Sequence, residues 1–309
     1  MRNYSEAEIC MLLLAAMPGD HKPVRDSLYR RLSHAAAALQ PEEPVGELSL
    51  EELLHLGCDR EEAENILWRL EQREALELYL NNLEEKGIFL TTRISGDYPN
   101  VLRERLGERS PLILYCAGNS ALLQKRAVSL VGSRKLREKG GRFARKMGAL
   151  IAREDYVYCS GGAEGTDSEG LIAAADNGGS AILFLPDSLL KAMEVPLYKK
   201  LLKEGRLLLV SLQGHDLPFT PARALDRNRL IHALGEKVLV AQSDYGTGGT
   251  WRGVMDNLKE GWSPVFLCND EPEAPGTRGL RERGCIPVET DRVRSVLDLA
   301  PIQKSLYDL

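Results

Sequence analysis

Short apolar runs alternate with amphipathic stretches from about residue 112 to near the end of the chain. Each run is a few residues long and rich in Val, Leu and Ile, which is typical of strands that are buried on both faces of a parallel sheet. The predicted strands span residues 112–115, 127–131, 156–159, 181–185, 207–210, 238–241, 265–267 and 286–288.

The stretches between these strands have the spacing of apolar positions that is typical of helices. They predict helices near residues 138–153, 166–176, 196–204, 223–234 and 249–260. Strands and helices that alternate in this way form βαβ units, whose helices cover both faces of one sheet. The sequence therefore predicts an α/β fold with a Rossmann-like, doubly wound and mostly parallel sheet.

The first 95 residues have a different pattern, in which longer helical stretches are separated by Pro and Gly. Helices are predicted at residues 6–17, 24–39, 48–56 and 60–82, with a break rich in Pro and Gly at residues 41–46. We therefore predict a small, all-α acidic domain in residues 1–95 and a Rossmann-like domain in residues 96–290. A short C-terminal helix or tail would occupy residues 291–309.

Length and composition agree with a two-domain globular protein. The chain has 309 residues, of which 43% are hydrophobic and 28% are charged. The apolar stretch at residues 9–17 is too short to span a membrane, so no membrane partner is expected. The six cysteines form no C-x-x-C pair and no cluster with His at metal-ligand spacing. This pattern predicts reduced thiols in a cytoplasmic protein that binds no metal.

The net charge of −5 hides a division along the chain. Residues 1–95 contain 10 Lys/Arg and 18 Asp/Glu, whereas residues 96–309 contain 30 and 27. Residues 125–153 hold ten of these cations and a single acid, Glu138. Such a segment is either a solvated helix face or the source of a local field that attracts phosphate groups.

Three glycine-rich turns follow predicted strands and open predicted helices. They are Gly132-Ser133-Arg134, then Ser160-Gly161-Gly162 with Gly165, and finally Gly248-Gly249-Thr250. The carboxyl ends of parallel strands lie at one edge of a sheet, and ligands bind at that edge. Glycine lets the backbone approach an anion, while hydroxyls, helix amides and Arg134 can donate hydrogen bonds to it. Together the turns predict a cradle for phosphate.

The helix predicted at residues 223–234 begins with a cluster of polar and cationic side chains, Arg223, Arg227, Asn228 and Arg229. These either extend the cradle or only form ion pairs with Asp226 at the helix start. The chain has neither the dinucleotide G-x-G-x-x-G nor the Walker motif, so no cofactor is predicted. G-x-S-x-G and H-E-x-x-H are also missing, and the sequence predicts no catalytic residue.

Taken in order, these motifs resemble the DNA-processing protein A family (DprA, also called Smf). The resemblance runs from Asp97-Tyr98-Pro99 through residues 110–119, 131–134, 160–167 and 227–231 to the loop at residues 246–250. The acidic N-terminal helices are similar to the small SAM-like domain of that family. Only about twenty residues follow residue 289, so we expect no C-terminal winged-helix domain of the kind found in some members.

The resemblance implies a protein without enzymatic activity that binds single-stranded DNA in a positively charged pocket and protects it. It also implies a homodimer that helps to load a RecA-type recombinase during DNA uptake and recombination. Arg134 and the Ser160-Gly161 turn would contact phosphates, and residues 227–229 would line the same pocket, with Arg223 nearby. In the family a phenylalanine precedes R-N-R, whereas Ala224 and Leu225 stand at that place here.

Two alternatives use the same phosphate-binding turns. Residues 160–169 also resemble the P-G-G-x-G-T-x-x-E loop of nucleotide phosphoribohydrolases, in which Glu169 would be catalytic and Arg134 would hold the substrate phosphate. This enzyme hypothesis ranks second, because it leaves the R-N-R helix and the N-terminal domain unexplained. A third hypothesis is a sensor that binds a nucleotide-derived signal and contacts a partner through its acidic helices.

Overall fold

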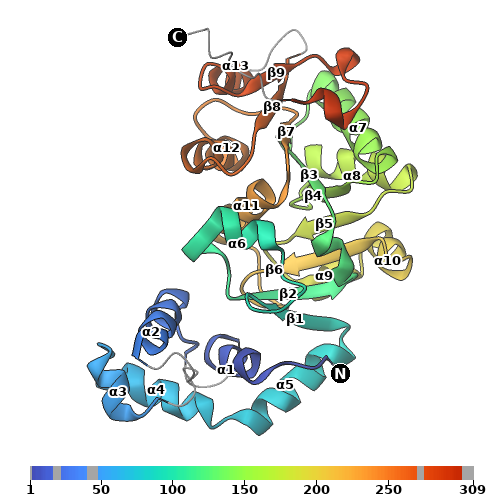
Figure 1. Ribbon diagram of the computed structural model, residues 1–309. Helices are drawn as coiled ribbons and strands as arrows, with labels where there is room; N and C mark the ends of the chain where they lie inside the picture. The colour runs from blue at the N-terminus through green and yellow to red at the C-terminus, as the bar shows by residue number, and fades with distance from the viewer. Residues whose placement is uncertain (1, 17–21, 40–47, 270–274, 301–309) are drawn as a thin grey trace.

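The computed structural model describes residues 2–16, 22–39, 48–269 and 275–300. Its centre is a nine-stranded sheet with the strand order β1-β2-β6-β5-β4-β3-β7-β8-β9 (Figure 1). From β6 to β9 in this order, neighbouring strands are parallel. These strands are β3 (Ala127–Val131), β4 (Val157–Ser160), β5 (Ala181–Phe184), β6 (Leu207–Ser211), β7 (Val238–Val240), β8 (Val265–Cys268) and β9 (Ile286–Val288). The predicted α/β fold with a mostly parallel sheet is confirmed.

Two antiparallel strands extend the sheet at the β6 edge. Strand β2 (Ile113–Gly118) pairs with β6, and β1 (Ile88–Thr92) pairs with β2. Strand β1 was not predicted, because it lies within the N-terminal segment that was interpreted as entirely helical. Its sequence, IFLTT, is nevertheless a buried run rich in β-branched residues.

Alternate side chains of each strand pack on opposite faces of the sheet, as the pleat requires. In β3, Val128 and Leu130 belong to the core on one face, while Ala127 and Val131 belong to the core on the other. Figure 1 shows the first face covered by α7 (Glu138–Arg153), α8 (Thr166–Asp176), α9 (Leu189–Met193) and α10 (Pro196–Lys203). The second face is covered by α6 (Asn100–Leu106), α11 (Pro221–Leu234), α12 (Gly248–Glu260) and α13 (Pro275–Arg281).

The N-terminal helices lie beyond β1, at the lower end of the molecule in Figure 1. They are α1 (Glu6–Ala15), α2 (Asp26–Leu39), α3 (Leu50–His55), α4 (Arg60–Leu70) and α5 (Arg73–Glu85). The single helix predicted at residues 60–82 is therefore two helices, separated at Glu71 and Gln72. Capping boxes fix the starts of α1, α3 and α4. The predicted Pro and Gly break at residues 41–46 lies outside the described residues.

After β9 the chain forms two short 3₁₀ turns, Thr290–Arg292 and Val296–Asp298. The rest of the predicted C-terminal segment, residues 301–309, lies outside the described residues. Among the helices that are described, none is both long enough and apolar enough to cross a membrane.

Candidate functional site

A cavity of about 710 Å³ opens at the carboxyl ends of β3 and β7. These two strands are neighbours, and β4 lies on the far side of β3, so the strand order reverses between β3 and β7. Helices that follow such strands diverge to opposite faces and leave a crevice, which is the usual ligand site of doubly wound folds. The wall of the cavity comes from residues 131–135 after β3, from the start of α11 and from residues 244–252. Ala163, Asp167, Phe219 and His232 complete it.

The loop after β3 is held from two sides. The amide of Ser133 donates to the carbonyl of Gln242 (2.9 Å), and the Gln242 side chain binds the Lys135 carbonyl (3.0 Å) and the Arg137 amide (2.9 Å). From the other side, both the amide and the hydroxyl of Thr166 donate to the carbonyl of Ser133 (3.2 and 3.1 Å). The backbone that carries Arg134 is therefore fixed before any ligand binds.

Gly165 presses closely against this loop. Its φ is +79°, and a Cβ at this position would lie 2.5 Å from the Arg134 carbonyl oxygen and 2.6 Å from that of Ser133. Gly178 has the same φ of +79°, but a Cβ there would meet nothing within 4 Å. Gly178 is therefore a control for a positive φ without a clash, whereas Gly165 combines a positive φ with a ψ of −119° and a steric clash.

We expect Gly178→Ala to destabilise the protein by about 1 kcal/mol, because an L-residue pays this much in the left-handed region. Gly165→Ala adds a clash with two fixed carbonyl groups and is expected to cost about 2 kcal/mol or more beyond the control. Urea unfolding of both variants checks the difference. Equal losses of stability in the two variants would show that the loop after β3 shifts to accommodate the added methyl group at no cost in free energy.

Arg227 and Asn228 connect α11 to the turn after β4 and to the start of α12. The Arg227 guanidinium donates to the Gly161 carbonyl (3.0 Å) and to Asn228 Oδ1 (2.6 Å), and Asn228 Nδ2 donates to the Gly249 carbonyl (3.2 Å). Arg227 is only 8% exposed, and its Nε has no hydrogen-bond partner among the described residues. A buried guanidinium with a spare donor at a cavity wall is suited to an anionic or carbonyl ligand.

Asp167 lies in the cavity wall, close enough for its charge to act on Arg227, and it has a structural role. Its carboxylate accepts hydrogen bonds from the amides of Gly161 and Ala163, both at 3.2 Å. Burial raises the pKa of Asp167, against the opposing effects of Arg227 and of these hydrogen bonds. Burial also lowers the pKa of Arg227, which the charge of Asp167 partly offsets. Asp167 thus orients the turn after β4 and compensates the buried cation.

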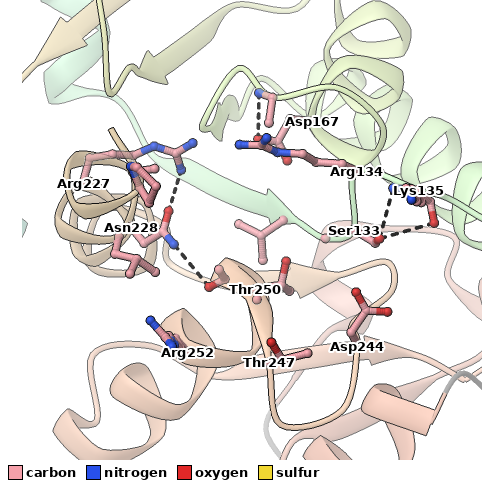
Figure 2. A pocket seen from close by; sticks show the side chains of 18 of the residues that line it. Ser133, Arg134, Lys135, Asp167, Arg227, Asn228, Asp244, Thr247, Thr250 and Arg252 are labelled. Carbon is pink, nitrogen blue, oxygen red and sulfur yellow. Dashed lines mark hydrogen bonds between the residues drawn. The ribbon is translucent and has the colours of Figure 1, made fainter. Parts of the chain in front are cut away.

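The cavity wall is electropositive. It carries four cationic side chains, Arg134, Lys135, Arg227 and Arg252, and two acidic ones, Asp167 and Asp244. Figure 2 shows Arg134 and Arg227 reaching toward one another from opposite sides, with Arg252 pointing in from α12. The Arg134 guanidinium lies 5.7 Å from the ring centre of Phe219, which is 47% exposed. Arg134 and Arg252 form no ion pair within the described part of the chain, so their charges face the cavity uncompensated.

Helix α12 begins at the cavity wall. Its N-cap residue, Thr247, makes no side-chain hydrogen bond to the first turn, so the amides of that turn have no cap from this side chain. Gly248, Gly249 and Thr250 all line the cavity. Free amides and the positive end of the helix dipole favour a negatively charged group at this place.

The structure brings together eight of the fourteen residues predicted as phosphate or DNA contacts. Those that line the cavity are Gly132, Ser133, Arg134, Arg227, Asn228, Gly248, Gly249 and Thr250. The other six, Ser160, Gly161, Gly162, Gly165, Arg223 and Arg229, are not part of its wall.

Several of these six residues interact with parts of the protein outside the cavity. The Ser160 hydroxyl donates to the Leu130 carbonyl inside the sheet (2.9 Å). The Arg223 side chain donates to Gln213 Oε1 (2.9 Å) and to the Pro218 carbonyl, and so holds the loop before α11. Arg229 pairs with Asp226 (3.3 Å) and lines a smaller cavity beside the N-terminal helices. Of the turn after β4, only Ala163 belongs to the cavity wall, and its predicted residues lie outside the wall.

Several residues that line or support the cavity were not predicted. Gln242 holds the loop after β3, and it directly follows the predicted strand 238–241, so the rule that residues after strands form the site would have found it. His232 lies four residues after Asn228 on α11, which places both on one helix face. Phe219 supplies an aromatic ring before α11, although no phenylalanine directly precedes R-N-R.

The position of Glu169 does not support the hydrolase alternative. Its carboxylate pairs with Arg145 of α7 (2.7 Å), and Glu169 is not part of the cavity wall. Across residues 2–16, 22–39, 48–269 and 275–300, no three His, Cys, Asp or Glu side chains are grouped so that they could hold a metal ion.

Comparison with known families decides which family this architecture represents. The sequence profile of the family described as DNA recombination-mediator protein A matches residues 89–284, well over half of the chain. The chain belongs to this family. The match includes every turn of the cavity and all of strand β1 except its first residue, and it confirms the resemblance to DNA-processing protein A that the motifs indicated. A search of curated protein sequences finds no match.

Solved structures of DNA-processing protein A have the same fold. The protein from Streptococcus pneumoniae superposes with a TM-score of 0.70 at 21% identity, over 94% of this chain and 97% of that one. The protein from Helicobacter pylori, whose structure was described for its single-stranded DNA binding mode, gives a TM-score of 0.54 at 24% identity. That match covers 65% of this chain and 90% of the H. pylori chain. The S. pneumoniae match extends over the N-terminal helices as well as the sheet.

Proposed function

We propose that this member of the DNA recombination-mediator protein A family binds single-stranded DNA in the cavity between β3 and β7. The observation that carries the proposal is the set of cationic side chains and uncapped helix amides that converge there, with four cations against two acids in the cavity wall. Membership in the family and the DNA binding described for the H. pylori protein point in the same direction. By the family resemblance, the bound strand would be protected and handed to a RecA-type recombinase by a homodimer.

The cradle has separate places for a phosphate and for a base. Arg134 offers a bidentate donor, and the start of α12 offers amides, so a backbone phosphate can be held between them. Phe219 is exposed beside Arg134, and an exposed ring can stack on a base of any sequence. Together they give an interface that binds DNA with little sequence preference.

The depth of the cavity favours a single strand over a duplex. Arg227 is 8% exposed and lies in the wall of a recess. A flexible single strand can place a phosphate or an unpaired base in such a recess. The bases of a duplex are stacked and paired, so they cannot enter it. Duplex DNA is therefore expected to compete poorly.

A salt titration tests the proposal. We expect the affinity for a fluorescent single-stranded oligonucleotide to fall steeply with salt, because each phosphate bound by Lys or Arg releases counterions. With three or four phosphate contacts, the slope of log K against log salt should be about −2 to −3. Fluorescence anisotropy between low and physiological salt measures it.

Two competitors complete this experiment. An unlabelled duplex of the same length should displace the strand only at large excess, and a nucleoside monophosphate should displace it weakly. Affinity that does not change with salt would contradict the phosphate cradle. Absence of DNA binding, with cleavage of the monophosphate, would favour the phosphoribohydrolase instead.

A further inference from the structure

Tyr245 is an exposed aromatic residue in the loop between β7 and α12, next to residues that line the cavity. Its side chain is 57% exposed, although tyrosine usually buries most of its ring. It follows Asp244 directly and precedes Thr247 by two residues, and both of these neighbours line the cavity. Figure 2 shows Asp244 and Thr247 side by side on the wall of the cavity formed by the loop from β7 to α12.

The ring is held in place from beneath. Its centre lies 5.0 Å from that of Trp251, with the planes tilted by 54°, and the Arg283 guanidinium lies 5.9 Å and 5.1 Å from the two ring centres. Trp251 is 8% exposed and belongs to the core. One side of Tyr245 is therefore packed on a fixed base, and much of the rest of the ring is open.

Two glycines of α13 make room for this arrangement. A Cβ at Gly279 would lie 2.5 Å from the Tyr245 ring and 3.0 Å from the Trp251 ring. A Cβ at Gly276 would lie 2.1 Å from the carbonyl oxygen of Ser243, so the backbone before Tyr245 also rests directly on this helix. Helix α13 thus supports both the loop and the ring. Because the Tyr245 side chain is already ordered, it loses little conformational entropy when a ligand binds to it.

We propose that Tyr245 is a stacking platform for a nucleobase of the single strand whose phosphates occupy the cavity. The proposal rests on the proposed function, which it extends from the cavity to the surface of the loop between β7 and α12. An aromatic face binds every base, and the neighbouring Arg283 and Arg252 supply positive charge for the adjoining phosphates. A base on Tyr245 and a phosphate at the start of α12 would belong to neighbouring nucleotides.

The test compares an oligo(dT) strand with an abasic strand of the same length and charge. Binding of the full chain to both is measured by fluorescence anisotropy, for the wild type and for Tyr245→Ala and Tyr245→Phe. The measured quantity is the ratio of the dissociation constant of the abasic strand to that of oligo(dT). Because phosphate contacts are common to both strands, this ratio isolates the contribution of the bases.

We expect Tyr245→Ala to lower this ratio at least about fivefold, the lower end of the effect of one stacked base. Tyr245→Phe keeps the ring and should keep the ratio. Irradiation of the complex with a strand that contains 5-bromodeoxyuridine should crosslink Tyr245, which fragment sequencing of the tryptic peptide 238–252 would locate. An unchanged ratio in Tyr245→Ala would overturn the proposal. This holds also if the oligomeric mass of the variant changes while the ratio stays the same.

Failure of this inference can be told apart from failure of the proposed function. If the wild type does not bind oligo(dT), or binds it without salt dependence, the cradle itself is wrong. If the wild type binds with the expected salt dependence and the ratio does not respond to Tyr245, only the stacking platform is wrong.

Discussion

Replacement of Arg134 by alanine is expected to weaken binding to single-stranded DNA about tenfold or more at physiological salt, because one charged hydrogen-bonding contact is lost. Arg134 is exposed, has no ion pair in the described part of the chain and contacts only the Phe219 ring at the cavity. Its removal should therefore leave the free energy of unfolding unchanged. Anisotropy titrations and urea unfolding measure the two quantities on the same variant.

The salt dependence gives a second readout of the same change. Loss of one phosphate contact should reduce the slope of log K against log salt by about 0.7, the value for single strands. Arg134→Lys keeps the charge but not the planar fork, so it should restore the slope and only part of the affinity. An Arg134→Ala variant with wild-type affinity would remove Arg134 from the interface.

Arg153→Ala is the matched control for this experiment. Arg153 belongs to the same cationic segment, residues 125–153, but lies at the far end of α7 and binds Asn177 (2.9 Å). If the segment acted only through its total charge, both alanine variants would weaken binding equally. We expect Arg153→Ala to stay within about twofold of the wild type, because an exposed charge far from the site is screened by salt.

Replacement of Arg227 cannot test DNA binding separately from folding, although the sequence predicted Arg227 and Arg134 as equivalent contacts. Arg227 is buried, holds Gly161 and Asn228, and lies beside the buried carboxylate of Asp167. Its removal would leave that carboxylate without its compensating cation and would disturb the turn after β4. Binding and folding would change together, so the exposed Arg134 gives the cleaner experiment.

The sequence predicted the sheet well because the strands of a parallel sheet are buried on both faces. The run of residues 127–131 is apolar throughout, apart from the buried Ser129, and strand β3 occupies those residues. Strand β1 escaped prediction because it joins the sheet through β2, a contact between segments that local periodicity does not report. The break between α4 and α5 was missed for a similar reason, because residues 60–82 are helical in pattern throughout.

The candidate site was predicted in outline and not in detail. Glycine-rich turns indicated the correct edge of the sheet, since strand ends and helix starts are local features. Which turn faces the cavity depends on the strand order, and the cavity lies at the reversal between β3 and β7, so the turn after β4 contributes only Ala163 to the wall. Arg229 points elsewhere because residues 227 and 229 lie on different sides of one helix, and which side faces the cavity is known only from the packing of α11.

Stability should fall in weak acid because of His232, a residue of the cavity wall. His232 is 1% exposed, and its Nδ1 has no hydrogen-bond partner among the described residues. Burial, and to a smaller degree the charge of Arg227, lowers the pKa of His232 to about 3. In the unfolded chain the pKa of a histidine is about 6.5, so unfolding takes up a proton between these two values. The stability contributed above pH 6.5 is thus lost as the pH falls toward 3.

We expect this residue alone to remove about 2 kcal/mol from the free energy of unfolding between pH 7 and pH 5. His232→Asn does not titrate and should lose this part of the pH dependence, whatever its stability at pH 7. His55→Asn is the control, because His55 is exposed on α3. Urea unfolding at the two pH values measures all three proteins, and an equal pH dependence in wild type and His232→Asn would contradict the argument. Since a protonated His232 would place a second cation beside the buried Arg227, the neutral ring is also what allows Arg227 to remain in the wall of the DNA cavity.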